Sequence, residues 1–284
     1  MSYVFQPELI QGIEITVQPY EEPLHLDEVK LHLKQDDITT DDTTIASLMV
    51  AGRDVVETET GKNRRKNRVC MSTKFSKYLD VFPNVDFIQL PRVPLSSAVA
   101  DLVITYVDTN GDTQTLSTDV YTFDPSTGRI LLKYAQVWPA TQFQRKSITI
   151  SFIAGQATKF TAVAATDVVT LYGRTLTDGD RVRVMNSGGA LPAGLSAKTD
   201  YFVINASGAT CKFSLTSGGA AVDITDTGTG IQYVSTDLIP FETMRNAIKL
   251  MVTHLYRNRS AVVVGTIAQQ LPLAVDSLCA AAQA

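Results

Sequence analysis

Neighbouring carboxylates are the residues of this sequence whose type and spacing suggest acid–base chemistry. Glu21–Glu22, Asp36–Asp37 and Asp41–Asp42 each place two carboxyl groups side by side. A pair of carboxylates in one cleft is what general acid–base catalysis and glycoside hydrolysis require. All three pairs lie beside expected helix starts or in polar loops, where acidic side chains commonly cap a helix or stay solvated. We therefore predict capping or solvation for these pairs rather than catalysis.

Other side chains that carry chemistry are few and scattered. Three histidines and three cysteines occur in 284 residues, without a CxxC spacing, so the sequence predicts neither a zinc site nor a disulfide framework. The motifs GxxxxGK[ST], GxSxG, HExxH and GxGxxG do not occur. We predict a protein that is not an enzyme, with no catalytic residue, no metal site and no cofactor. The alternative from another class is a cell-wall or carbohydrate hydrolase, whose candidate acids are not singled out by their spacing: Asp101, Asp108 and Asp124.

A run of cations stands out in a chain that is acidic overall. Lysine and arginine total 25 against 29 aspartates and glutamates, a net charge of -4, so no general attraction to nucleic acid or acidic lipid is expected. Two interpretations of the run stay open: a solvated connection beside the negative C-terminal end of a helix, or a loop that contacts DNA phosphates or an acidic partner. No aromatic residue interrupts it, so base stacking is not expected. The run follows Gly61 and defines the basic loop: Lys62, Arg64, Arg65, Lys66 and Arg68.

Helical periodicity appears at the two ends of the chain. Apolar residues repeat at intervals of three and four over Leu26–Leu33, then from Asp41 or Asp42 to a stop at Gly61, and again after Pro240. Gly52 lies on the apolar side of the second helix, where it would let another backbone approach closely. The chain then continues as an apolar C-terminal segment, which ends in a helix of small residues and needs a partner surface. Its candidate docking residues are Val262, Val263, Val264, Leu271, Pro272, Leu273, Val275 and Leu278.

Two regions between the helices have the character of strands. In residues 69–156, runs of β-branched and aromatic residues are separated by turns at Asn110–Gly111 and Pro125–Gly128. Trp138 is expected to anchor a loop over this β unit. In residues 157–236 the chain becomes rich in Gly, Ala, Ser and Thr, and five short strands between turns indicate a second, small all-β module.

The predicted fold class is α+β. The helices at either end are too few to form separate cores, so we expect a small helical bundle built from N- and C-terminal helices and interrupted by two inserted antiparallel β units. The expected domains are a helical core with a C-terminal docking segment (1–68 plus 237–284), a β unit (69–156) and an inserted all-β module (157–236). The sequence shows neither a signal peptide nor a span of about 20 apolar residues, which predicts synthesis in the cytoplasm and no membrane contact.

This order of segments resembles the head-tail connector, or adaptor, proteins of long-tailed bacteriophages and gene transfer agents. The resemblance covers about residues 20–156 and 237–280. Residues 157–236 depart from the family pattern, in which the strand ending near Gly155 leads directly into the last long helix; they look like a small β module that recurs in phage structural proteins. The stretches that carry the resemblance are Pro23–Leu33, Ile45–Gly61, Ile88–Ser97, Tyr106–Gly111, Ile150–Gly155, Pro240–Arg259 and Leu271–Val275.

The resemblance implies a virion structural protein at the head–tail interface, or neck. Such adaptors form a ring below the portal, twelve-fold by family analogy, which extends the DNA channel and provides the platform for the neck and tail. The implied partners are the portal protein, neighbouring adaptor subunits in a homo-oligomeric ring, the next neck or tail protein, and packaged DNA through non-specific contact in the channel. The family's C-terminal segment docks on the portal, and it corresponds here to about Val262–Ala284. The alternative within structural proteins is another tail-completion or baseplate protein.

Overall fold

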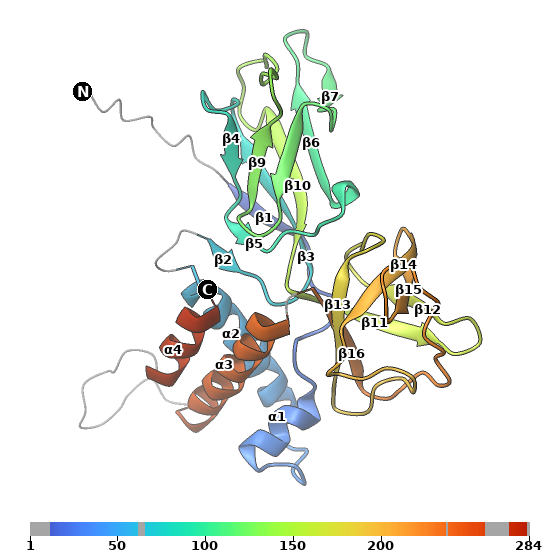
Figure 1. Ribbon diagram of the computed structural model, residues 1–284. Helices are drawn as coiled ribbons and strands as arrows, with labels where there is room; N and C mark the ends of the chain where they lie inside the picture. The colour runs from blue at the N-terminus through green and yellow to red at the C-terminus, as the bar shows by residue number, and fades with distance from the viewer. Residues whose placement is uncertain (1–11, 62–65, 237, 259–272, 283–284) are drawn as a thin grey trace.

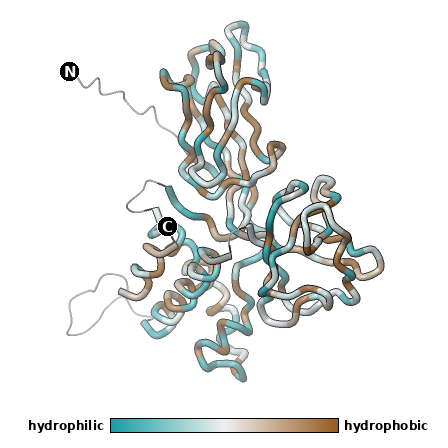
Figure 2. The backbone as a smooth tube through the Cα atoms, in the orientation of Figure 1, coloured by the Kyte–Doolittle hydropathy of each residue, from teal (hydrophilic) through white to brown (hydrophobic). Residues whose placement is uncertain are grey.

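Three lobes meet at a common centre (Figure 1). The computed structural model describes residues 12–61, 66–236, 238–258 and 273–282. One lobe holds the helices, the second holds two packed sheets, and the third is a closed barrel. Hydrophobic and hydrophilic stretches alternate within every lobe (Figure 2), and the buried apolar side chains form three separate clusters.

The helical lobe is built around one long helix. It contains α1 (Leu26–Leu33), α2 (Asp42–Glu59), α3 (Leu238–Arg257) and α4 (Leu273–Ala282), and both α2 and α4 pack along α3 (Figure 1). A Cβ atom added at Gly52 would lie 3.2 Å from Val252 Cγ2. This distance confirms the predicted close contact, which here joins α2 to α3.

The helical core also takes in side chains from the β regions. Met71, Met185 and Tyr233 belong to the same buried cluster as the apolar faces of α1 to α4. The α+β class is therefore confirmed, but a helical bundle that is closed on itself is not. Four helices of this length leave apolar surface that only the neighbouring strands cover.

The sheet lobe packs two antiparallel sheets against each other. The larger has the order β1-β3-β10-β6-β7 and the smaller the order β4-β9-β8. Phe75, Ile150 and Phe152 of the larger sheet share one core with Ile88 and Ile130 of the smaller. The strands are β1 (Ile13–Val17), β3 (Thr73–Leu79), β4 (Phe87–Gln89), β6 (Leu102–Val107), β7 (Thr113–Thr115), β8 (Tyr121–Asp124), β9 (Arg129–Leu132) and β10 (Ile148–Ala154).

Both predicted turns of the sheet lobe are present. Asn110 and Gly111 join β6 to β7, and Gly128, with a φ of +67°, closes the turn between β8 and β9. Trp138 anchors its loop as expected, because its indole N–H donates to the carbonyl of Val85 at 2.8 Å. A short parallel pair, β2 (Asn67–Arg68) and β5 (Arg92–Val93), and a 3₁₀ turn at Val99–Asp101 complete the lobe.

The third lobe is a six-stranded barrel with its own core. Its strands close in the order β11-β12-β15-β14-β13-β16. Large side chains such as Phe160, Tyr201 and Phe213 fill the interior. The strands are β11 (Ala157–Val163), β12 (Val168–Leu171), β13 (Arg181–Ser187), β14 (Tyr201–Ser207), β15 (Thr210–Ser214) and β16 (Ile231–Ser235). Among the helices that the structure describes, none is long and apolar enough to cross a membrane.

Candidate functional site

Two of the three carboxylate pairs in the N-terminal region bind side chains of other elements. Asp41 occupies the N-cap position of α2 but makes no side-chain capping hydrogen bond. Its carboxylate instead accepts a hydrogen bond of 2.5 Å from the hydroxyl of Tyr256 on α3, so this side chain joins α2 to α3 and does not cap its own helix. Asp42 pairs with Lys30 at 2.8 Å. Asp36 and Asp37 are exposed in the loop after α1, as predicted for solvated carboxylates. Ion pairs also hold Glu21 to Lys159 and Glu22 to Arg53.

The three aspartates that a hydrolase would need each have a structural role. Asp108 accepts backbone N–H groups of its own hairpin, and these hydrogen bonds lower its pKa. Asp124 accepts hydrogen bonds from the hydroxyls of Ser126 and Thr127 in the turn after β8, and these hydrogen bonds lower its pKa. Asp101 accepts the Ser96 hydroxyl at 2.5 Å and the backbone N–H of Thr175 at 2.9 Å. Asp108 and Asp124 thus stabilise turns, and Asp101 stabilises the boundary between the sheet lobe and the barrel.

Cysteine or metal chemistry finds no support in the described part of the chain. Cys70, Cys211 and Cys279 are all free and buried. Burial raises the pKa of Cys211 to about 12 and that of Cys279 to about 11, so both stay protonated and unreactive at neutral pH. No group of three His, Cys, Asp or Glu side chains among the described residues is placed to hold a metal ion.

Two hollows on the surface do not gather catalytic groups. One, of about 390 Å³, lies at the loops of the sheet lobe beside Phe82 and Trp138. The other, of about 530 Å³, lies on the barrel beside Val203 and Lys212. Each has a single carboxylate in its lining, Asp86 in the first and Asp178 in the second, whereas hydrolytic acid–base chemistry needs two.

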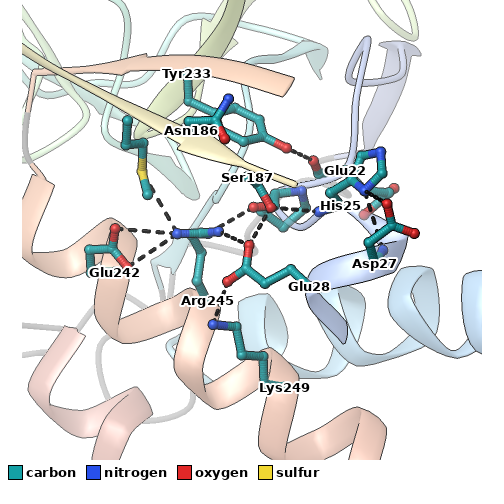
Figure 3. Close-up of polar contacts among 12 residues, drawn as sticks. Glu22, His25, Asp27, Glu28, Asn186, Ser187, Tyr233, Glu242, Arg245 and Lys249 are labelled. Carbon is teal, nitrogen blue, oxygen red and sulfur yellow. Dashed lines mark hydrogen bonds and ion pairs between the residues drawn. The ribbon is translucent and has the colours of Figure 1, made fainter. Parts of the chain in front are cut away.

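The densest group of polar contacts lies where the helices meet the barrel (Figure 3). The side chain of Arg245 on α3 is only 4% exposed. Its guanidinium lies 2.5 Å from Glu28 of α1 and 3.2 Å from Glu242, and it donates to the backbone carbonyl of Pro23 at 2.8 Å. Lys249, one turn further along α3, lies 2.5 Å from the second oxygen of Glu28. One carboxylate of α1 is thus held between two cations of α3.

The barrel contributes the remaining groups of this cluster. The hydroxyl of Ser187 on β13 donates to Glu28 and accepts the backbone N–H of His25 at 2.8 Å. Tyr233 of β16 donates to the carbonyl of Glu22 at 2.6 Å. Burial alone would raise the pKa of Glu28, but Arg245, Lys249 and Ser187 together hold it below its usual value. The carboxylate therefore stays ionised and fixes α1, α3 and the barrel in one arrangement.

A second cluster joins α2 to the segment between β2 and β3 of the sheet lobe. Arg53 donates two hydrogen bonds to Glu22, of 2.8 and 3.2 Å, and lies 3.6 Å from Glu57. Glu57 accepts the backbone N–H of Cys70 at 2.8 Å. Burial raises the pKa of Glu57 to about 7, although Arg53 and the Cys70 N–H act in the opposite direction.

A third cluster joins the sheet lobe to the barrel. The Ser97 hydroxyl donates to Asp180 at 2.9 Å, and Asp101 receives the Thr175 N–H described above. Arg174 is 4% exposed and donates to the carbonyl of Gly155 at 3.2 Å. We call the three clusters the inter-lobe junctions. Most of their polar groups bind one another, which fixes the lobes relative to each other. The exceptions in the third cluster are Arg174 Nε and the Thr175 hydroxyl, which are buried without a hydrogen-bond partner among the described residues.

Sequence reasoning missed these junctions. The one local signal was Arg245 itself, a cation within the apolar repeat that Phe241 and Ile248 define on α3. A charged residue at such a position indicates a buried ion pair. The partners of Arg245 could not be named, because Glu28 and Pro23 are 217 and 222 positions away from it along the chain.

The predicted basic loop lies only partly in the described structure. Lys62, Arg64 and Arg65 fall outside the described residues. Lys66 and Arg68 are half-buried, and the backbone N–H of Arg68 donates to the Thr60 hydroxyl at 2.8 Å. The strand β2, which includes Arg68, pairs with β5 and holds this end of the loop against the sheet lobe. Whether the loop meets DNA stays a prediction.

The predicted docking residues divide in the same way. Val262, Val263, Val264, Leu271 and Pro272 lie outside the described residues, and Leu273 begins α4. Val275 is fully buried and Leu278 partly buried in the helical core. These two side chains are occupied by α4 packing on its own chain. They are therefore occupied within the chain, and the docking of the segment before them on a partner stays a prediction.

No protein-family model matches the sequence, and no curated protein matches it. Solved structures do share its fold. A chain from the neck of an empty GTA particle computed with C6 symmetry has 13% identity and a TM-score of 0.51, and the match covers 95% of this chain and 94% of that one. A chain from the virion of a native gene transfer agent (GTA) particle has 14% identity and a TM-score of 0.52, over 94% and 92% of the two chains.

A third similar chain comes from the neck of a native GTA particle computed with C12 symmetry. It has 14% identity and a TM-score of 0.50, over 95% of this chain and 94% of that one. Each match spans nearly the whole of both chains, so the likeness extends over all three lobes and is not limited to a single lobe. This chain therefore shares its overall fold with chains of gene transfer agent necks and virions.

Proposed function

We propose that this protein is a structural component of the neck of a phage-like or gene transfer agent particle, and that it acts as the head–tail adaptor. The observation that carries the proposal is the fold shared with two GTA neck chains, over at least 94% of this chain and of each neck chain. The sequence resemblance to adaptors supports it independently. The inter-lobe junctions suit such a role, because a neck component has to keep its shape while DNA passes.

The adaptor would act as a ring of identical copies below the portal. Neighbouring copies in a ring meet through heterologous contacts that close on themselves. One similar neck is computed with C12 symmetry and another with C6 symmetry, and a ring of twelve copies is compatible with both. The ring would extend the DNA channel and present a platform for the next neck or tail protein. No catalytic step is part of this role.

The C-terminal segment is the proposed contact with the portal. Its apolar side chains at Val262, Val263, Val264, Leu271, Pro272 and Leu273 would bury against the portal protein. Val275 and Leu278 would hold the end of this segment on α3 through α4. A Val263→Asp substitution should abolish portal binding in a pull-down, whereas Ala280→Asp, an exposed position on α4, should leave it unchanged. Equal binding by both variants would contradict this contact.

The basic loop is the proposed contact with packaged DNA. Five cations next to a channel would attract the phosphate backbone without reading its sequence. Exchanging Arg64, Arg65 and Lys66 for glutamine should cause particles to lose DNA or to assemble poorly. The matched control exchanges Lys198 and Lys212 of the barrel. Full DNA retention in the loop variant would favour the solvated-connection interpretation instead.

The placement itself is tested by electron microscopy of particles from cells that produce them. A tagged copy of the protein should appear as a ring with an axial hole between the head and the tail, attached to the portal. Label at the distal tail would identify a tail-completion or baseplate protein instead. Absence of the protein from particles would reject a structural role and would make an activity screen the next step.

A further inference from the structure

One edge of the larger sheet is open and apolar. Among the described strands, β1 pairs only with β3, and all five of its residues are exposed. The opposite edge, β7, is exposed too, but it is three residues long and polar: Thr113, Gln114 and Thr115. Natural proteins protect long apolar edges, because unpaired N–H and C=O groups there recruit another strand.

The β1 side chains on the core side of the larger sheet are not covered by the rest of the lobe. Ile15 lies directly across from Phe75, which is buried in the core of the lobe. Ile13 and Ile15 therefore point to the same side as that core, yet they are 36% and 45% exposed. A strand added beside β1 would bury both. The register shifts between Ile15 and Val17, so regular pairing would involve the part of β1 before this bulge.

The chain itself supplies a segment that fits this edge. Residues 1–11 directly precede β1, and their one charged side chain is Glu8. Tyr3, Val4 and Phe5 are residue types that favour strands. Pro7 ends this stretch, since proline cannot donate to a ladder. The five residues from Pro7 to Gln11 span at most about 17 Å, enough to reach a copy that lies beside this sheet lobe.

The turn chemistry disfavours folding back onto the same chain. A tight two-residue hairpin turn between residues 2–6 and β1 would need Gly, Asn or Asp, and Pro7–Gln11 contains none of them. Gly12 is not free to join the turn, because its carbonyl already accepts the N–H of Tyr78 on β3. The segment is thus suited to leave its own lobe.

We infer that residues 2–6 of one copy add a strand to the open β1 edge of a neighbouring copy. The contact is heterologous: each copy gives one N-terminal strand and receives another. Main-chain hydrogen bonds to β1 supply the affinity, and Tyr3 and Phe5, which share one face of the added strand, bury apolar surface with Ile13 and Ile15. Repeated around an axis, the same contact joins all copies of a closed ring.

Reciprocal variants of the full chain test the exchange. Ile15→Lys damages the edge and leaves the strand intact, whereas Phe5→Lys damages the strand and leaves the edge intact. Sedimentation velocity should show reversible self-association of the wild type and at least about tenfold weaker association of each variant alone. An equimolar mixture of the two variants should form a dimer that grows no further, because one good strand then meets one good edge.

The controls separate this contact from a general loss of solubility or folding. Leu215→Lys introduces the same charge at an apolar side chain that is 62% exposed on the barrel, and it should associate like the wild type. Circular dichroism melting should be unchanged in all three variants. A wild type that stays monomeric at about 1 mM, or a mixture that behaves as the sum of its parts, would overturn the inference.

The ring in this inference rests on the proposed function, but different experiments test the strand exchange and the proposed function. Strand exchange is measured with the purified protein alone. Failure there would leave a neck position intact with another ring contact. A protein that exchanges strands but is absent from the neck would reject the proposed function and keep the exchange.

Discussion

At the scale of single residues, Arg245 is the charge that joins the helices to the barrel. Its side chain is 4% exposed and contacts Glu28, Glu242 and the carbonyl of Pro23. Removing one partner of a buried ion pair leaves the other uncompensated. We expect Arg245→Met to lower the free energy of unfolding by about 3 kcal/mol, measured by urea titration at neutral pH.

The matched control is an ion pair at the surface of the barrel. Arg181 lies 3.7 Å from Asp200, and its side chain is 71% exposed. Exposed pairs contribute little, so Arg181→Met should cost less than about 1 kcal/mol. Equal losses of unfolding free energy in the two variants would contradict the prediction that the buried Arg245 contributes more to stability than an exposed arginine.

Glu57 gives a second prediction at this scale, on pH. Its pKa of about 7 in the folded protein is above the usual 4.5 because the carboxyl is buried. The folded state therefore holds a proton that the unfolded state releases between these values. The stabilisation is fully present below about pH 4.5 and is lost as the pH rises through 7, by up to about 3 kcal/mol.

Glu57→Gln should remove this dependence, since the amide still accepts the Cys70 N–H but does not titrate. The free energy of unfolding of the wild type should fall relative to the variant between pH 4.5 and 7.5 in parallel urea titrations. Asp54→Asn changes an exposed acid of the same helix and should follow the wild type. A constant difference between wild type and Glu57→Gln would contradict the raised pKa.

At the scale of elements, the contact between α2 and α3 depends on Gly52. A Cβ there would lie 3.2 Å from Val252 Cγ2 and 3.6 Å from the carbonyl of Ile248, so a larger side chain forces the helices apart. Gly52→Leu should destabilise the protein by about 1–3 kcal/mol in urea unfolding. Ala51→Leu, the next and exposed position, should stay within about 0.5 kcal/mol. The prediction fails if the two leucines have the same effect.

Local patterns predicted the elements well, because each depends on residues close in sequence. The helix expected over Leu26–Leu33 has those bounds in the structure, and the Asn110–Gly111 hairpin is in place. The strands β1 and β11 were missed. The sequence of β1, Ile-Glu-Ile-Thr-Val after Gly12, does alternate as a strand should, and this signal was overlooked. β11 reads Ala-Thr-Lys-Phe-Thr-Ala-Val, and its small and polar residues did not stand out from the Gly-, Ala-, Ser- and Thr-rich segment that it begins.

The junctions between elements were beyond sequence reasoning for a different reason. Glu28 meets Ser187 and Arg245 across 159 and 217 positions, and no periodicity links residues so far apart. The expected helical bundle was not confirmed for the same reason. The helical core is completed by Met185 and Tyr233 of the barrel, which only the three-dimensional arrangement brings to the helices.

At the scale of the whole molecule, the helices and the barrel should open as one unit. They share a hydrophobic cluster and the Glu28 junction, so neither can unfold without exposing the other's buried surface. Native-state hydrogen exchange in increasing urea should give α3, β13 and β16 the same free energy of opening. The β6–β7 hairpin should open more easily, because β7 is fully exposed at the sheet edge. In Arg245→Met the values for α3 and the barrel should separate. Unequal values in the wild type would mean that the helices and the barrel are joined but do not open as one unit.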